Sequence, residues 1–338
     1  MSISGNALVM KEININLVRK TLKAKREATK HQIAQATGLS TVTVATMLQE
    51  LVDNNEAFEA GLAASMGGRP AQLFHFNENH AHVLVLFTHE QDGLDRLYIR
   101  VADLFGTCIH AVDVPLAEIT LTTFEAYIDQ AMQEYPSIKA IGLGLPGVVL
   151  DGTFITGDYQ ALVGAPLLPH YEARYDLPVL FANDVNAATV GYVKRVDIDA
   201  GDGVVYFYFP QKYPPGAGFY LDGKLYKGYR HHAGEITQLP FDVNWRDSDL
   251  YRSPEQVSEA ISELIIMTSS LLNPRGIVLY GSFLTDLHIR LIQDVCRTRL
   301  LADAMPAIHL TQDFTQDYEI GMIQETLALL EPQISISL

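Results

Sequence analysis

The stretch HHAGEITQLP, from His231 to Pro240, gathers groups that could do chemistry. Imidazoles and carboxylates bind metals and also act as general acids and bases. Two adjacent histidines rarely point toward one ion, however, and no ligand cluster accompanies His231 and His232 in the sequence. We therefore expect no metal here, and the residues alone leave open whether the stretch is a catalytic centre or a binding loop.

A second candidate site is the pair Asn183 and Asp184, which follows the apolar run LPVLF. Carboxylates and amides form directional hydrogen bonds with the hydroxyl groups of a ligand. The carboxyl end of a strand is also where open α/β sheets place ligand groups. The alternative is structural, because both residue types cap helices.

The segments around these residues predict an α/β fold. From residue 82, apolar runs typical of strands, such as HVLVLF and GIVLYG, alternate with helical patterns such as SPEQVSEAISELIIMTSSLLN. This alternation favours layered sheets and helices.

Residues 1–80 have a different pattern, which indicates a winged helix-turn-helix. Helices are expected at about 13–25 and 30–36, then a turn at Gly38, then a helix capped by Ser40. Two short apolar runs around a glycine-rich tip follow as the wing. This order suggests DNA binding, although a three-helix packing module without a DNA role stays open.

The start of the third helix would face the major groove, where its small side chains touch thymine methyls and make single hydrogen bonds. Basic residues before it would contact phosphates, and Arg69 in the wing tip would enter a minor groove. With so few cations, tight binding needs a homodimer or tetramer on paired half-sites. The residues expected to contact DNA are Lys25, Arg26, Lys30, Ser40, Thr41, Val42, Thr43, Thr46 and Arg69.

Charge and composition exclude several classes of protein. The formal net charge is −16, yet residues 1–80 hold eight basic against seven acidic residues, so the acidity lies in the remainder. Such a body makes broad nucleic-acid affinity implausible outside the N-terminus. There is no run of about 18 apolar residues and no secretory signal pattern, and the two cysteines are isolated. We expect a cytoplasmic protein that makes no membrane contact.

The motifs GLGLPGVV, FANDVNAA, GAGFYLDGKLYKG, HAGEITQ, LNPRGIVLYG and GMIQETLALL, together with the N-terminal pattern, resemble the ROK family of repressors and sugar kinases over nearly the whole chain. The resemblance implies a body of two actin-like (ribonuclease H-like) lobes with a sugar cleft between them. The expected parts are 1–80 for the DNA-binding domain, 81–190 with 315–338 for the first lobe, and 191–314 for the second.

The same resemblance assigns roles to residues. Asp184 corresponds to the general base of the kinases, and Asn183 and Glu235 correspond to sugar-hydroxyl ligands. Glycines would let backbone approach the ligand, and Gln238 stands where the family has a histidine that binds both sugar and zinc. The residues expected to contact a ligand are Gly144, Pro146, Gly147, Asn183, Asp184, Glu235 and Gln238.

Three departures from the family argue against kinase activity. The Asp-x-Gly-x-Thr phosphate motif is missing from residues 84–100, and FPQKYPPGAG replaces a glycine-rich loop. Tyr280 and Gly281 replace a glycine pair. The zinc cysteines are missing from FDVNWRDSDLYRSPEQ, and YQALVGAPL places Ala161 near the position of a sugar-binding asparagine. We therefore expect no cofactor, no metal and no catalytic residue.

These observations predict a transcriptional regulator, expected to be a repressor, that binds operator DNA and senses a sugar or sugar phosphate. Two alternatives remain open. One is a sugar kinase that retains a DNA-binding head, which the intact Asp184 favours. The other is a ligand-free regulator controlled by a protein partner.

Overall fold

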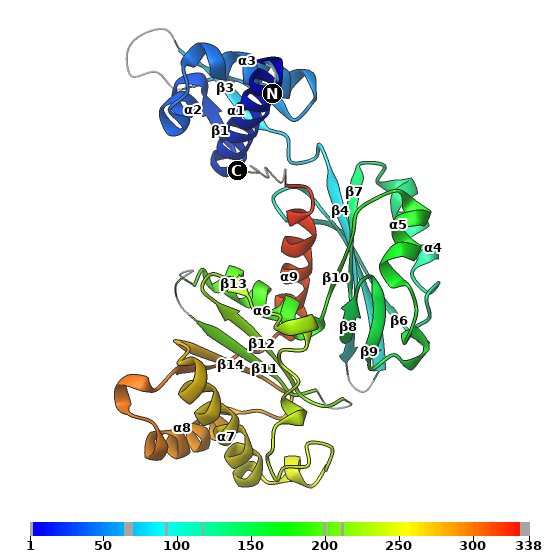
Figure 1. Ribbon diagram of the computed structural model, residues 1–338, viewed down its shortest axis with the longest axis vertical. Helices are drawn as coiled ribbons and strands as arrows, with labels where there is room; N and C mark the ends of the chain where they lie inside the picture. Colours follow the sequence, from blue (N-terminus) through cyan, green and yellow to red (C-terminus); the bar gives the residue numbers. More distant parts are fainter. Residues whose placement is uncertain are drawn as a thin grey trace. The chain divides into compact units, whose positions relative to one another are not determined.

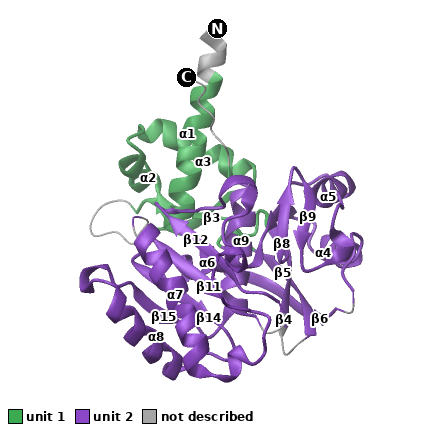
Figure 2. Cartoon of the chain, turned by 60° about the horizontal axis from the view of Figure 1, so that its bottom comes forward, with its two compact units in different colours: residues 1–82, 103–105, 331–338 green, residues 83–102, 106–330 purple. Residues whose placement is uncertain are grey.

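The computed structural model describes residues 3–63, 70–91, 94–116, 118–198, 201, 203–210 and 213–331. The chain forms two compact units (Figure 2). Unit 1 contains the described residues of 1–82, 103–105 and 331, and unit 2 contains those of 83–102 and 106–330.

Unit 1 consists of three helices and a three-stranded sheet in the order β1-β3-β2 (Figure 1). The bounds are α1 (Ile3–Lys25), β1 (Glu27–Thr29), α2 (Lys30–Thr37), α3 (Thr41–Asp53), β2 (Ala57–Leu62) and β3 (Gln72–Phe76). The first helix begins ten residues before the expected start, since no proline interrupts residues 3–12.

Local side-chain chemistry explains the bounds of α2 and α3. Thr29 and Gln32 form a reciprocal capping box at the start of α2, and Gly38 ends it with a φ of 72°. Ser40 then caps α3 by accepting a hydrogen bond from the backbone N–H of Thr43. Val44, Leu48 and Leu51 are fully buried on one face of α3, as the helical spacing predicts.

Unit 2 contains two five-stranded sheets of the same topology (Figure 1). The first has the order β6-β5-β4-β7-β10 and the second β13-β12-β11-β14-β15. In each sheet the strands, numbered by their order in the chain, therefore lie in the order third, second, first, fourth and fifth. The strands of the first sheet are β4 (His82–Gln91), β5 (Leu94–Ala102), β6 (Cys108–Pro115), β7 (Ile138–Gly144) and β10 (Val179–Ala182). Those of the second are β11 (Val204–Tyr208), β12 (Gly216–Leu221), β13 (Lys224–Leu225), β14 (Gly276–Tyr280) and β15 (Ala307–Leu310).

Helices cover these sheets and bury a separate apolar core beside each one. They are α4 (Glu125–Glu134) and α5 (Leu167–Tyr175) in the first half, and α7 (Pro254–Leu272) and α8 (Asp286–Arg299) in the second. A hairpin of β8 (Gly147–Leu150) and β9 (Thr153–Gly157) follows β7.

Two further helices, α6 (Asp184–Val196) and α9 (Phe314–Ala328), join the halves. Helix α6 packs on β11 and β12, whereas α9 packs on β7 and β10, and the two helices contact each other (Figure 1). The boundary that we predicted between the two lobes, after residue 190, therefore falls inside the continuous helix α6. The division into three parts stays a prediction.

Small residues let α6 and α9 approach closely. A Cβ on Gly191 would lie 1.8 Å from the carbonyl oxygen of Asp317, and a Cβ on Gly321 would lie 1.8 Å from that of Ala187. Because both obstacles are backbone atoms, side-chain rotation cannot relieve the clash.

We predict that Gly191→Ala lowers the free energy of unfolding by about 3 kcal/mol, because the helices must separate to admit the methyl group. Chemical denaturation measures the loss. Gly201→Ala is the matched control, since a Cβ there meets nothing within 4 Å. Equal stability of the two variants would contradict the close packing.

None of the helices in the described part of the chain has the length and apolar character needed to cross a bilayer.

Candidate functional site

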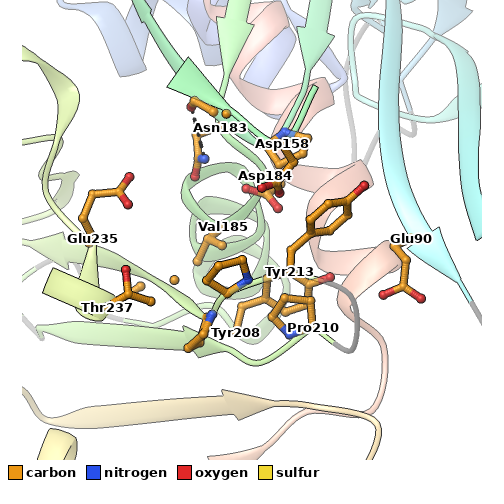
Figure 3. Close-up of a pocket in the computed structure, with 18 of the residues that line it drawn as sticks. Glu90, Asp158, Asn183, Asp184, Val185, Tyr208, Pro210, Tyr213, Glu235 and Thr237 are labelled. Carbon is orange, nitrogen blue, oxygen red and sulfur yellow. Dashed lines mark hydrogen bonds between the residues drawn. The ribbon is translucent and has the colours of Figure 1, made fainter. Parts of the chain in front are cut away.

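A pocket of about 1030 Å³ lies within unit 2, lined by residues of both sheets and the loops that follow them (Figure 3). The N-terminus of α6 forms one wall, and the hairpin β8–β9 contributes to another. The lining also includes the short helix η3 (Ile236–Gln238) and the loop before β12.

Asn183 and Asp184 lie in this pocket at the point where β10 ends and α6 begins. The Asn183 side chain caps the helix, since its Oδ1 accepts a hydrogen bond from the backbone N–H of Asn186 at 3.2 Å. Its Nδ2 donates to the carbonyl of Gly147 at 3.3 Å. The structural role considered for Asn183 is therefore present, and it fixes the geometry of the pocket wall.

The environment of Asp184 favours its neutral form. Burial raises its pKa from 3.8 to about 7, and the negative charges of Asp158 and, less strongly, Glu235 act in the same direction. Hydrogen bonds from the backbone N–H groups of Val185 and Asp184 oppose this shift. Asp158 lies beside Asp184 in Figure 3.

We predict that Asp184→Asn raises the melting temperature at pH 8 and raises it much less at pH 5. A raised carboxyl pKa means that the folded state retains a proton that the unfolded state has lost between about pH 4 and 7. This contribution to stability is complete at low pH and disappears as pH rises through 7. The measurement is a thermal melt across this range, with the exposed Asp151→Asn as control. A pH-independent effect of Asp184→Asn would contradict the shift.

The glycines of GLGLPGVV have separate roles. Pro146 and Gly147 line the pocket, and Gly147 adopts a φ of 151°, where a Cβ would lie 2.5 Å from the carbonyl of Thr156. Gly144 is not a lining residue. A Cβ there would meet the Tyr318 hydroxyl at 2.5 Å, so its small size serves packing beneath the pocket.

Glu235 and Gln238 line the pocket from the second half, with Thr237 between them. His231 and His232 also line it, and His231 Nδ1 lies 3.2 Å from the carbonyl oxygen of Val149 on β8. No group of three or more His, Cys, Asp or Glu residues with metal-binding geometry occurs among the described residues.

The polar lining residues that the sequence did not predict include Glu90, Asp158, Gln160 and Asn186. Ala161 does not line the pocket, whereas Asp158, Tyr159 and Gln160 directly before it do. This loop therefore retains polar groups. Asn186 is 7% exposed, and its Oδ1 has no hydrogen-bond partner within the protein.

An aromatic cluster occupies the part of the fold where the family resemblance implies phosphate binding. It consists of His89 on β4, Tyr208 on β11, Tyr280 on β14 and Phe314 on α9. The Phe314 ring stacks on Tyr208 with centroids 4.0 Å apart, and lies 5.0 Å from His89 and 5.5 Å from Tyr280. Burial lowers the pKa of His89 to about 4, so this imidazole is neutral at pH 7.

In unit 1, the residues expected to contact DNA are exposed or half-buried where the structure describes them. Val42 is 76% exposed at the start of α3, beside Thr41. The Arg26 guanidinium lies 4.3 Å above the Phe105 ring, and the Lys30 ammonium 5.3 Å from the Phe74 ring. Arg69 lies outside the described residues.

Residues 99–246 match the model of the ROK family. This segment of the chain is therefore similar to the ROK family domain. This finding confirms the resemblance that the sequence motifs indicated.

Proteins similar to this chain include both repressors and kinases. The chain is 26% identical over 251 residues to a putative xylose repressor of Caldicellulosiruptor sp. (strain Rt8B.4), covering 71% of this chain and 61% of that protein. It is 30% identical over 130 residues to an N-acetyl-D-glucosamine kinase of Vibrio parahaemolyticus, covering 37% of this chain and 42% of the kinase. The chain thus spans less than two thirds of the repressor's length.

The fold matches a solved ROK family transcriptional regulator, described as a homologue of the E. coli MLC protein, with a TM-score of 0.71 and 18% identity. The match covers 96% of this chain and 99% of the regulator. The expectation of an α/β protein with a ROK-type body is therefore confirmed.

Proposed function

We propose that this protein is a sugar-responsive transcriptional repressor. The observation that carries the proposal is the combination, in one chain, of an exposed α3 start in unit 1 with a carboxylate-lined pocket in unit 2. Two relatives that are named as xylose repressors support the proposal.

Unit 1 would act as a winged helix-turn-helix, with α3 in the major groove and β2 and β3 as the wing. The exposed Thr41, Val42 and Thr46 would reach base edges, and Lys25, Arg26 and Lys30 would contact phosphates. Two such heads on paired half-sites require a homodimer or tetramer, which we include in the proposal together with a cytoplasmic location.

The charges in the pocket favour a neutral sugar over a sugar phosphate as effector. Its described lining contains four carboxylic acids, Glu90, Asp158, Asp184 and Glu235, whereas Arg246 is the one Arg or Lys among those residues. Carboxylates accept hydrogen bonds from sugar hydroxyls but repel a phosphate in such a partly buried site. A sugar that contains xylose is the first candidate because of the relatives' names.

Sugar binding would regulate DNA binding by favouring one arrangement of the two halves of unit 2. The pocket is lined from both halves, so a ligand that contacts both stabilises a closed state. The response then depends on the difference in sugar affinity between the DNA-bound and free states.

Kinase activity is the second candidate, which the intact Asp184 and the kinase relatives favour. The aromatic cluster opposes it, because stacked rings take the place of glycine backbone and a cation beside the phosphates. We propose that the protein does not transfer phosphate. Phosphorylation of any sugar in an ATP-coupled assay would contradict this.

The experiment that tests the repressor function has two steps. DNA selected from a random pool by the full chain gives the operator, and fluorescence anisotropy then measures its affinity with and without D-xylose, D-glucose or N-acetyl-D-glucosamine. We expect at least about tenfold weaker operator binding with one of these sugars. If no sequence is enriched from the pool, the DNA-binding part is refuted. If operator affinity is unchanged with all three monosaccharides, sensing of a monosaccharide is refuted.

A further inference from the structure

The pocket continues beyond the carboxylates to three aromatic residues that we call the aromatic wall: Trp245, Tyr251 and Phe283. We propose that this wall is a second sugar subsite and that the effector carries at least two sugar rings. The inference rests on the sugar-sensing function proposed above and goes further by fixing the size of the ligand.

The dimensions of the pocket support more than one ring. Its volume of about 1030 Å³ lies at the upper end of the about 300–1,000 Å³ common for pockets that hold drug-sized ligands. A single sugar held by Asp184 and Glu235 would leave much of this space filled with water. A second ring linked to the first would extend along the same continuous pocket.

The aromatic wall is rigid before any ligand binds. Trp245 is 6% exposed, and its ring centroid lies 5.6 Å from that of Phe209. The Tyr251 hydroxyl donates to the Trp245 carbonyl at 2.8 Å, and the Tyr251 and Phe283 rings meet at 5.0 Å with an interplanar angle of 71°. Rings that packing already holds lose little entropy when a ligand lies against them.

The chemistry of the wall suits a sugar ring. The C–H face of a sugar packs against aromatic rings, while its hydroxyls need polar partners at the ring edge. Arg246 and Ser248, both exposed, line the pocket in the same segment as Trp245 and supply such partners. Trp245 and Tyr251 belong to the segment in which the family's zinc cysteines are missing, so aromatic residues here take the place of a metal loop.

A nucleotide is a poorer occupant. Its phosphates would meet the carboxylates of Asp184 and Glu90, which line the same pocket. Of the described lining residues, Arg246 is the one Arg or Lys that could offset that charge.

Calorimetry on the full chain tests the subsite with matched sugars: D-xylose against β-1,4-xylobiose, and D-glucose against cellobiose, maltose and sucrose. We expect one disaccharide to bind at least about tenfold more tightly than its monosaccharide. Phe283→Leu, which retains bulk but removes the ring, should weaken disaccharide binding about three- to tenfold and leave monosaccharide binding unchanged. Tyr229→Ala, an 85% exposed aromatic outside the pocket lining, is the matched control.

The possible outcomes separate this inference from the proposed function. A monosaccharide that binds as tightly as its disaccharides would overturn the second subsite and leave sugar sensing intact. The second subsite is also overturned if Phe283→Leu weakens the binding of both sugars equally, or if ATP competes with the disaccharide. If no sugar of the panel binds, both the subsite and the sugar-sensing function fail.

Discussion

Replacing Val42 by glutamate should abolish sequence-specific operator binding while leaving the fold intact. Val42 is 76% exposed in the first turn of α3, so the substitution removes no core contact. In the proposed complex the new carboxylate would replace an apolar contact with base edges by a charge close to phosphates. Each unfavourable base contact costs about 1–3 kcal/mol, and a dimer incurs it at both half-sites. We therefore expect operator affinity to fall at least about 30-fold.

Fluorescence anisotropy with the selected operator measures this loss, and circular dichroism checks the fold. Leu301→Glu is the matched control, because Leu301 is 80% exposed in unit 2 and would receive the same charge far along the chain from the DNA-binding residues. If Val42→Glu and Leu301→Glu bind the operator equally well, α3 does not enter the groove as proposed.

The elements of the fold could be predicted from the sequence because their signals are local. Ser40 and Ser253 each cap the helix that follows by accepting a hydrogen bond from a backbone N–H three residues on. Apolar runs such as 204–208 and 276–280 became buried strands. Helix α6 follows the first sheet but packs on the second, and α9 follows the second sheet but packs on the first. This arrangement depends on Gly191 and Gly321, which contact residues more than a hundred positions away, and no local pattern reveals it.

The candidate site could be predicted in part for a related reason. Six of the seven residues expected to contact a ligand line one pocket, because they lie at strand ends and loops that the motifs identify. Their binding of a ligand stays a prediction. Asp158 could not be found this way, since its proximity to Asp184 arises when the chain folds.

The aromatic cluster shows what replaces the family's phosphate-binding motifs in this chain. In the sequence these replacements are visible only as missing motifs. His89 and Tyr280 lie in two of the degenerate segments, and Tyr208 directly precedes the third, FPQKYPPGAG. In the structure their rings gather around Phe314, which none of those motifs contains. The departures are therefore coupled, because each ring fills space that the others leave.

Glu235→Gln should remove most of the response to sugar without changing operator binding in its absence. Glu235 lines the pocket from the second half, opposite the α6 terminus in Figure 3, so it can contact a sugar that Asp184 also contacts. A hydrogen bond to a charged group contributes about 1.5–3 kcal/mol, and the amide retains the shape but not the charge. We expect sugar affinity to fall about 10- to 100-fold.

Calorimetry measures the sugar affinity, and anisotropy measures the sugar concentration that releases operator DNA. Glu172→Gln, which neutralises an exposed carboxylate on α5, should leave both quantities unchanged. The two readouts must shift together, since release is driven by the binding energy of the sugar. If Glu235→Gln weakens sugar binding but DNA is released at the wild-type concentration, the effector acts at another site. In that case this pocket is not the sensor.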